Sequence, residues 1–240
     1  MFNRPKKYNK QSGNALIIIF VAIALFAALS FALSQGSRTG ESDLSEQQAS
    51  LLATEILDYS NAIRNAVRQI KIQGCQDEEI SFENSAVTLY TNAGSPADNT
   101  CHVFHPSGGG QVYLAPNRSA LNTGLSSETN LYFGEWSFFG RHCIADIGTC
   151  ATNAHLMLNL SQIQDAVCNE INDRANIAAL PLVNWDVSKT ATSEFTGTYT
   201  VNAGTELTEA NLDSRTFGCF RDNAGDGDGH NVFFQILIAR

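Results

Sequence analysis

The segment GNALIIIFVAIALFAALSFALS, residues 13–34, governs how the rest of the chain is read. From Ala15 to Leu33 it is apolar except for Ser30, and it carries no charge. At ~1.5 Å of rise per residue, a helix over this run would be about 28 Å long, close to the thickness of a bilayer's hydrocarbon core. The sequence therefore predicts a transmembrane helix over residues 14–34.

The charges divide sharply on either side of this segment. Residues 1–40 hold five Lys or Arg and no acid, whereas residues 41–240 hold the other ten bases and all 24 acids, so +5 and −14 give the total of −9. A basic end stays cytoplasmic. We therefore expect a single pass through a bacterial inner membrane, with the C-terminal domain periplasmic or on an extracellular filament. A domain of charge −14 does not bind nucleic acid by neutralising phosphates.

Three interpretations of the N-terminus are open. A cleaved secretory signal would end near Ala32-Leu33-Ser34, which has small residues at the right spacing. An uncut signal anchor would keep the whole segment. A leader cut after Gly13 would remove the basic residues and keep the apolar helix. The apolar run is longer than the usual 7–15 residues of a secretory signal, which favours the second and third interpretations.

The helical pattern resumes beyond the apolar run. A polar segment with glycines, residues 35–40, reads as a hinge, and an amphipathic helix is predicted over residues 41–74, ending at Gly74. Apolar residues recur there in steps of three, four and seven: Leu44, Leu51, Leu52, Ile56, Tyr59, Ile63, Val67 and Ile70. A cleaved secretory signal has no need of such a continuation.

This order of segments resembles a type IV pilin or a pseudopilin of type II secretion. The likeness covers a basic leader (residues 1–13) ending in Gly13, an apolar helix, an amphipathic half-helix, and a cysteine-bearing domain over residues 75–240. It implies cleavage between Gly13 and Asn14 by a prepilin peptidase, with other pilin or pseudopilin subunits as partners. The implied fold is α+β: one long N-terminal helix packed on an antiparallel β-sheet domain with one further helix. The implied function is that of a filament subunit that assembles through its apolar helix.

Two positions depart from the family's pattern. Such proteins usually have Phe as the first mature residue and Glu as the fifth, where this chain has Asn14 and Ile18. The Glu pairs with the N-terminal amine of a neighbouring subunit, and a buried ammonium without a carboxylate costs several kcal/mol. A minor or tip subunit, which need not match a neighbour's amine, fits the missing Glu better than the major subunit does.

The outer domain is expected to hold short strands and one further helix. The helix is predicted over residues 162–176, with Ser161 and Gln164 at capping-box spacing. The last ten residues form a nearly continuous apolar run that is typical of a central buried strand. The other predicted strands are apolar or β-branched runs between turn residues: 80–82, 86–90, 102–104, 112–114, 131–139 and 195–201.

The cysteines indicate disulfides. All of them lie beyond the apolar helix, their number is even, and no CxxC pair is present: Cys75, Cys101, Cys143, Cys150, Cys168 and Cys219. Sequence allows 15 complete pairings. Among these we expect sequential neighbours to pair, 75 with 101, 143 with 150 and 168 with 219.

One loop resembles a calcium site. Asp222, Asp226 and Asp228 lie among glycines, and calcium prefers several oxygen ligands on a backbone that can curl. The EF-hand spacing is not met, because Ala224 holds the third position and no Glu closes the loop. The same residues also suit a solvated hairpin turn between Cys219-Phe220 and the last strand. Calcium is the single cofactor that the sequence suggests.

No constellation of nucleophile, base and orienting group is evident, so the sequence predicts a protein that is not an enzyme. His102 and His105 would point to opposite faces of a strand, which argues against a shared metal. Two rivals to the filament subunit remain. One is a single-pass, membrane-anchored periplasmic module that binds a glycan or calcium. The other is an envelope hydrolase whose site is assembled from distant residues.

Overall fold

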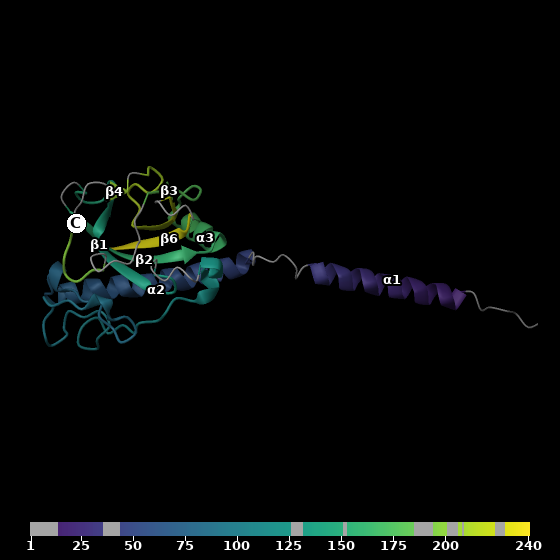
Figure 1. Cartoon of the computed structure of the whole chain (residues 1–240), viewed down its shortest axis with the longest axis horizontal. Helices are drawn as coiled ribbons and strands as arrows, with labels where there is room; N and C mark the ends of the chain where they lie inside the picture. Colours follow the sequence, from purple (N-terminus) through teal and green to yellow (C-terminus); the bar gives the residue numbers. More distant parts are fainter. Residues whose placement is uncertain are drawn as a thin grey trace, which may run out of the picture. The chain divides into compact units, whose positions relative to one another are not determined.

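The computed structural model describes residues 14–35, 44–125, 132–150, 153–184, 194–200, 206–207, 209–223 and 229–240. The chain divides into two compact units, residues 1–43 and residues 44–240 (Figure 1). The first unit contains helix α1, Asn14–Gln35. The second unit contains every other described helix and strand.

The expected single long helix is wrong. Helix α1 ends at Gln35, and the next helix, α2, begins at Glu46 in the other unit. The physical reason lies in the capping of α2. Oγ of Ser45 accepts a hydrogen bond from the Gln48 backbone N–H, and Oε1 of Gln48 accepts one from the Ser45 backbone N–H, each over 3.3 Å. This capping box satisfies backbone donors at a helix start, so α2 is a helix with its own beginning.

The expected membrane segment is also corrected. Within the residues that the structure describes, no helix is both long enough and apolar enough to cross a bilayer. The prediction of a single-pass inner-membrane protein with a periplasmic or filament-borne domain is therefore wrong.

Helix α2, Glu46–Ile72, buries one side and exposes the other. The predicted stop at Gly74 is confirmed: the helix ends two residues earlier, and Gly74 has φ +109°, which favours glycine. Leu52, Ile63 and Val67 are buried as expected, but Leu51 is 68% exposed.

Strands β2 and β6 form the middle of a mixed sheet (Figure 1). In the described residues the strands are β1 Trp136–Ile144, β2 His155–Ile163, β3 Leu182–Val183, β4 Glu206–Leu207, β5 Phe217–Asp222 and β6 Asn231–Ile238, in the order β3-β5-β6-β2-β1-β4. The four longer strands pair antiparallel, but β3 pairs parallel with β5 and β4 pairs parallel with β1. The expectation of an antiparallel sheet is wrong because short segments from long connections join both edges in parallel.

Apolar cores cover both faces of this sheet. On one face, α2 contributes Ile63 and Val67 to a cluster with Leu158 of β2 and Phe233 of β6. On the other face, alternate residues of the longer strands join side chains from the short edge strands and the connections: Phe139, Met157, Phe220 and Phe234 with Ile177, Val183, Leu207 and Leu212. The predicted central strand at the C-terminus is confirmed as β6, whose eight residues are all buried.

The second predicted helix exists but is shorter than expected. Helix α3 spans Asp165–Ala175, with Gln164 as its N-cap residue. Ser161 and Ile163 belong to β2, so the expected capping box is wrong. Most of the other short runs form turns. Residues 80–82 and 102–104 meet in a single bridge between Ser81 and His102, and residues 88–90 form a 3-10 turn.

The three disulfides join the pairs expected from the sequence. Cys75 bonds to Cys101, Cys143 to Cys150, and Cys168 to Cys219, with Cα atoms 5.8, 5.5 and 5.5 Å apart. The first links the end of α2 to the following loops, and the third links α3 to β5. The second and third cross-links therefore tie a loop and α3 to the sheet in the unit 44–240.

Candidate functional site on helix α1

Helix α1 has an apolar surface with no buried face among its described side chains. Residues 17–27 are all apolar, and all of them are exposed. Eight of them are large and more than half exposed: Ile17, Ile18, Ile19, Phe20, Val21, Ile23, Leu25 and Phe26. Contiguous apolar surface of this kind marks an interaction site in a folded protein.

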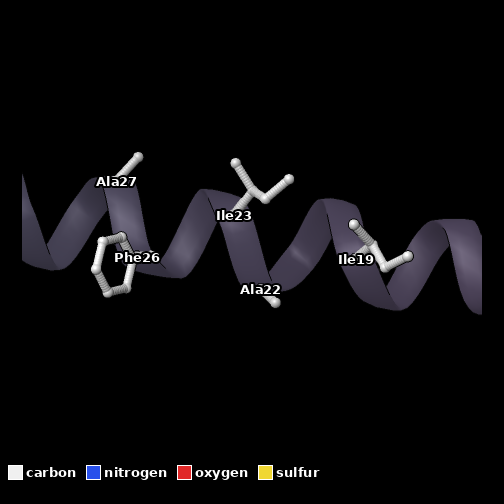
Figure 2. A pocket seen from close by; sticks show the side chains of 5 residues that line it. All are labelled: Ile19, Ala22, Ile23, Phe26 and Ala27. Carbon is white, nitrogen blue, oxygen red and sulfur yellow. The ribbon is translucent and has the colours of Figure 1, made fainter.

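One side of this surface is slightly hollowed. Figure 2 shows Ile19, Ala22, Ile23, Phe26 and Ala27 along the helix, and these residues line the hollow. The two alanines leave shallow grooves between larger side chains, where the ridge of another helix can pack. The hollow offers no acid, base or nucleophile. It can therefore bind apolar surface but cannot perform acid–base or nucleophilic chemistry.

The expected processing site falls at the start of this helix. Asn14 is the first residue of α1, and Gly13 lies outside the described residues. At the fifth position after the expected cut, Ile18 is 64% exposed. A neighbour's ammonium group would therefore meet an apolar side chain there. Cleavage between Gly13 and Asn14 stays a prediction.

The expected calcium ligands are only partly described. Asp222 is the last residue of β5 and is buried, and its Oδ2 lies 3.7 Å from Nε2 of the buried His230. The Asp222 N–H also donates to the carbonyl oxygen of His230 over 2.8 Å. Asp226 and Asp228 lie outside the described residues. In the part of the chain that is described, no three His, Cys, Asp or Glu side chains gather as metal ligands. The antiparallel pairing of β5 with β6 fits the hairpin alternative.

His102 and His105 lie closer together than the sequence suggested. Their ring centroids are 6.4 Å apart, because residues 101–109 turn instead of extending. Nδ1 of His105 accepts a hydrogen bond from the Ser107 N–H over 3.2 Å. Partial burial lowers the pKa of His102, and the charge of Glu83 opposes this shift. The hydrogen bond occupies one nitrogen of His105, so these rings do not form a ready metal site.

A buried polar cluster was not foreseen from the sequence. The Tyr132 hydroxyl donates to Oε1 of the buried Glu194 over 2.8 Å, and the Tyr90 hydroxyl accepts from the Phe138 N–H over 3.3 Å. Burial raises the pKa of Tyr90 far above its usual value, and the nearby Tyr132 and Glu194 raise it further. Tyr90 therefore stays protonated and is no nucleophile. Nothing in the spacing of these residues along the chain signals their contact.

Comparisons with protein-family models, with curated proteins and with solved structures find no match for this chain.

Proposed function

We propose that this protein is a structural subunit of a filament of the type IV pilus or type II secretion pseudopilus kind. It assembles with other pilin or pseudopilin subunits through helix α1. The observation that carries the proposal is the exposed, uncharged surface of residues 17–27, which no described side chain of the same unit covers. The work of the protein in this proposal is assembly, and no catalytic step is part of it.

The free energies of burial and association favour contacts of α1 with several neighbouring helices. Fully burying a large apolar side chain is worth about 1.5–3 kcal/mol, so half-burial of each of the eight large side chains of α1 gives roughly 8 kcal/mol. Association of two molecules costs an estimated 4–15 kcal/mol in lost freedom of motion. One helix pair is thus marginal. A filament in which each α1 contacts several others buries the remaining surface, which makes the filament the favoured state.

The residue at the fifth position supports a minor or tip place for this subunit. Ile18 offers no carboxylate to the N-terminal amine of a neighbour. A subunit repeated along the whole filament would leave that amine unpaired at every contact, at a cost of several kcal/mol each time. A subunit used rarely or at the tip meets this cost rarely. If the protein were the dominant component of sheared filaments, this assignment would be wrong.

The mass of the N-terminal peptide tests the processing step. Removal of the leader by a prepilin peptidase gives a chain that starts at Asn14. A chain that retains Met1 contradicts the resemblance to prepilins. A chain that starts near Gln35 has lost α1 and contradicts the proposal as a whole.

Assembly itself is tested by substituting α1. Replacing Ile23 and Phe26 by Asp places two charges on the apolar surface, and isolated charges are costly to bury. We expect the amount of protein in the sheared, pelleted filament fraction to fall at least tenfold. The matched control replaces Val112 and Leu182, which are 70% and 61% exposed in the other unit, by Asp. Unchanged pelleting of the α1 variant would overturn the proposal.

A further inference from the structure

Helix α2 also has an exposed face with an unusual pattern. Leu51 and Ile72 are 68% and 88% exposed although both are large and apolar. They are 21 positions apart, which is three heptads, and Asp58 and Asn65 occupy the heptad positions between them. All four side chains are exposed. A heptad spacing keeps residues on one seam when two helices wind around each other.

The charges on this helix are separated along its length. Glu55 and Asp58 lie in the first half, and Arg64 and Arg68 lie in the second half. In the described part of the chain, no carboxylate forms an ion pair with either arginine. Arg64 donates to Oδ1 of the neutral Asn61 over 2.7 Å. Partial burial lowers the pKa of Arg64, and the positive charge of Arg68 lowers it further.

These features are self-complementary when the helix is reversed. The midpoint of the face lies between Asn61 and Ala62. Three pairs of residues are symmetric about this midpoint: Leu51 and Ile72, Asp58 and Asn65, and Glu55 and Arg68. In an antiparallel pair centred there, Leu51 of one copy lies beside Ile72 of the other. The acidic half of each helix then lies opposite the basic half of its partner. The small Ala62 at the centre allows close approach.

We propose that the exposed face of α2 binds the same face of a second copy of this chain, as an antiparallel, two-fold symmetric helix pair. The same patch serves both partners, as a two-fold contact requires. This contact goes beyond the proposed filament assembly because it uses residues of the unit 44–240 and none of α1.

An open hollow beside Leu51 supports the fit. It lies between the first turns of α2 and helix α3, and it receives Ile72 of the second copy. Its lining residues are Glu46, Gln47, Ser50, Leu51, Thr54 and Glu170. Arg174 of α3 donates to two of the lining residues, to the Ser50 carbonyl oxygen over 2.8 Å and to Oγ1 of Thr54 over 2.9 Å. Its guanidinium is thus held within the molecule, and the two glutamates face the basic end of the second helix.

The size of the contact sets its strength. A single pair of helices in contact over about 31 Å, the rise from Leu51 to Ile72, falls at the low end of specific interfaces, where complexes are weak and transient. We therefore expect a dimer that dissociates in the micromolar range. Because the charges are exposed, salt screens them, and the dimer weakens as ionic strength rises.

The test uses the full chain with Ile23→Asp and Phe26→Asp, so that α1 does not contribute, and measures dimerisation by sedimentation velocity. One chain adds Glu55→Arg and Asp58→Arg, which makes both halves of α2 basic. A second chain adds Arg64→Glu and Arg68→Glu, which makes both halves acidic. We expect the dimer Kd of each chain alone to rise about tenfold or more. An equimolar mixture of the two should dimerise as tightly as the parent.

The control chain carries Glu83→Arg and Asp98→Arg, the same change in charge at exposed positions outside α2, and should dimerise like its parent. A further chain with Leu51→Gln should lose dimerisation without any change in charge. A parent that stays monomeric at 100-fold the expected Kd, or a mixture that fails to regain dimerisation, would overturn the proposal. Neither result bears on filament assembly, because α1 is disabled throughout.

Discussion

The side-chain amide of Asn172 makes two hydrogen bonds to the backbone of Cys219. The Cys219 N–H donates to Oδ1 over 2.8 Å, and Nδ2 donates to the Cys219 carbonyl oxygen over 2.9 Å. Among the described residues, β3 pairs with β5 at Arg221 and Asp222, beyond this point. The amide therefore takes the place of a neighbouring strand. Cys168, on the same face of α3, bonds to the same residue of β5.

Replacing Asn172 by Leu should destabilise the protein by about 2–4 kcal/mol, because it leaves a buried N–H and a buried C=O without partners. The change in the free energy of unfolding is measured by urea denaturation. The control is Asn211→Ala, an exposed side chain that bonds to Glu209, which should change stability by less than about 0.5 kcal/mol. Equal effects of the two substitutions would show that the amide contacts contribute little.

Replacing Asn159 by Leu should instead stabilise the protein against unfolding. Asn159 is fully buried, and among the residues that the structure describes neither atom of its amide has a hydrogen-bond partner. Burying an unpaired polar group costs about 1–3 kcal/mol, and Leu has a similar size without that cost. We expect a higher urea midpoint than in the parent. A loss of more than about 1 kcal/mol would mean that the amide is satisfied by bound water.

The disulfides that close the longest and the shortest loops should contribute unequally to the stability of the folded state. Cys168 and Cys219 are 51 positions apart, whereas Cys143 and Cys150 are 7 apart. Loop-closure entropy gives about 4 kcal/mol for the longer loop and about 2 kcal/mol for the shorter. Removing each pair by double substitution with Ala should lower the unfolding temperature more for Cys168–Cys219. A larger effect of the short loop would point to strain or enthalpy as the dominant contribution.

The stability contribution of Asp165 should depend on pH. Burial alone would raise its pKa, but hydrogen bonds from Arg221 and Asn231 outweigh this effect and lower it. A lowered pKa stabilises the folded state above the unfolded value near 4, and the contribution disappears as pH falls through the folded value. Because the Asp165 side chain is 67% exposed, screening limits the contribution to about 1 kcal/mol or less.

Asp165→Asn should therefore lower the urea midpoint at pH 7. The difference between the two proteins should shrink at pH 3, where the carboxylate of the parent becomes protonated in both states. A difference that stays constant between pH 7 and pH 3 would show that the charge of Asp165 is irrelevant to stability.

Sequence reasoning found the elements whose pattern is local. The buried stripe of α2 and its stop at Gly74 follow from helical periodicity and from glycine's tolerance of positive φ. Strand β6 is rich in β-branched and aromatic residues, so it reads as a buried strand. The sequential disulfide pairs, one choice among the 15 that six cysteines allow, are the pairs in the structure.

The rest of the fold depends on contacts between distant residues. Strand β2 is buried on both faces, so its leucines, Asn159 and Ser161 show no alternation, and Ser161 resembled a helix cap instead. The parallel edge strands β3 and β4 have two residues each, too few for a pattern. The apolar surface of α1 was evident from composition. The same composition predicts a membrane crossing, but no described helix is both long enough and apolar enough for one.

The central claim is that α1 packs against the helices of neighbouring filament subunits, and photocrosslinking from within this helix tests it most directly. A photoreactive amino acid placed at Phe26, which is 76% exposed, should give an adduct with a neighbouring subunit on irradiation of the assembled filament. Mass spectrometry should map the attachment point to the apolar N-terminal helix of that subunit. Adducts that never contain a second filament subunit, or that attach only outside its apolar helix, would contradict the account.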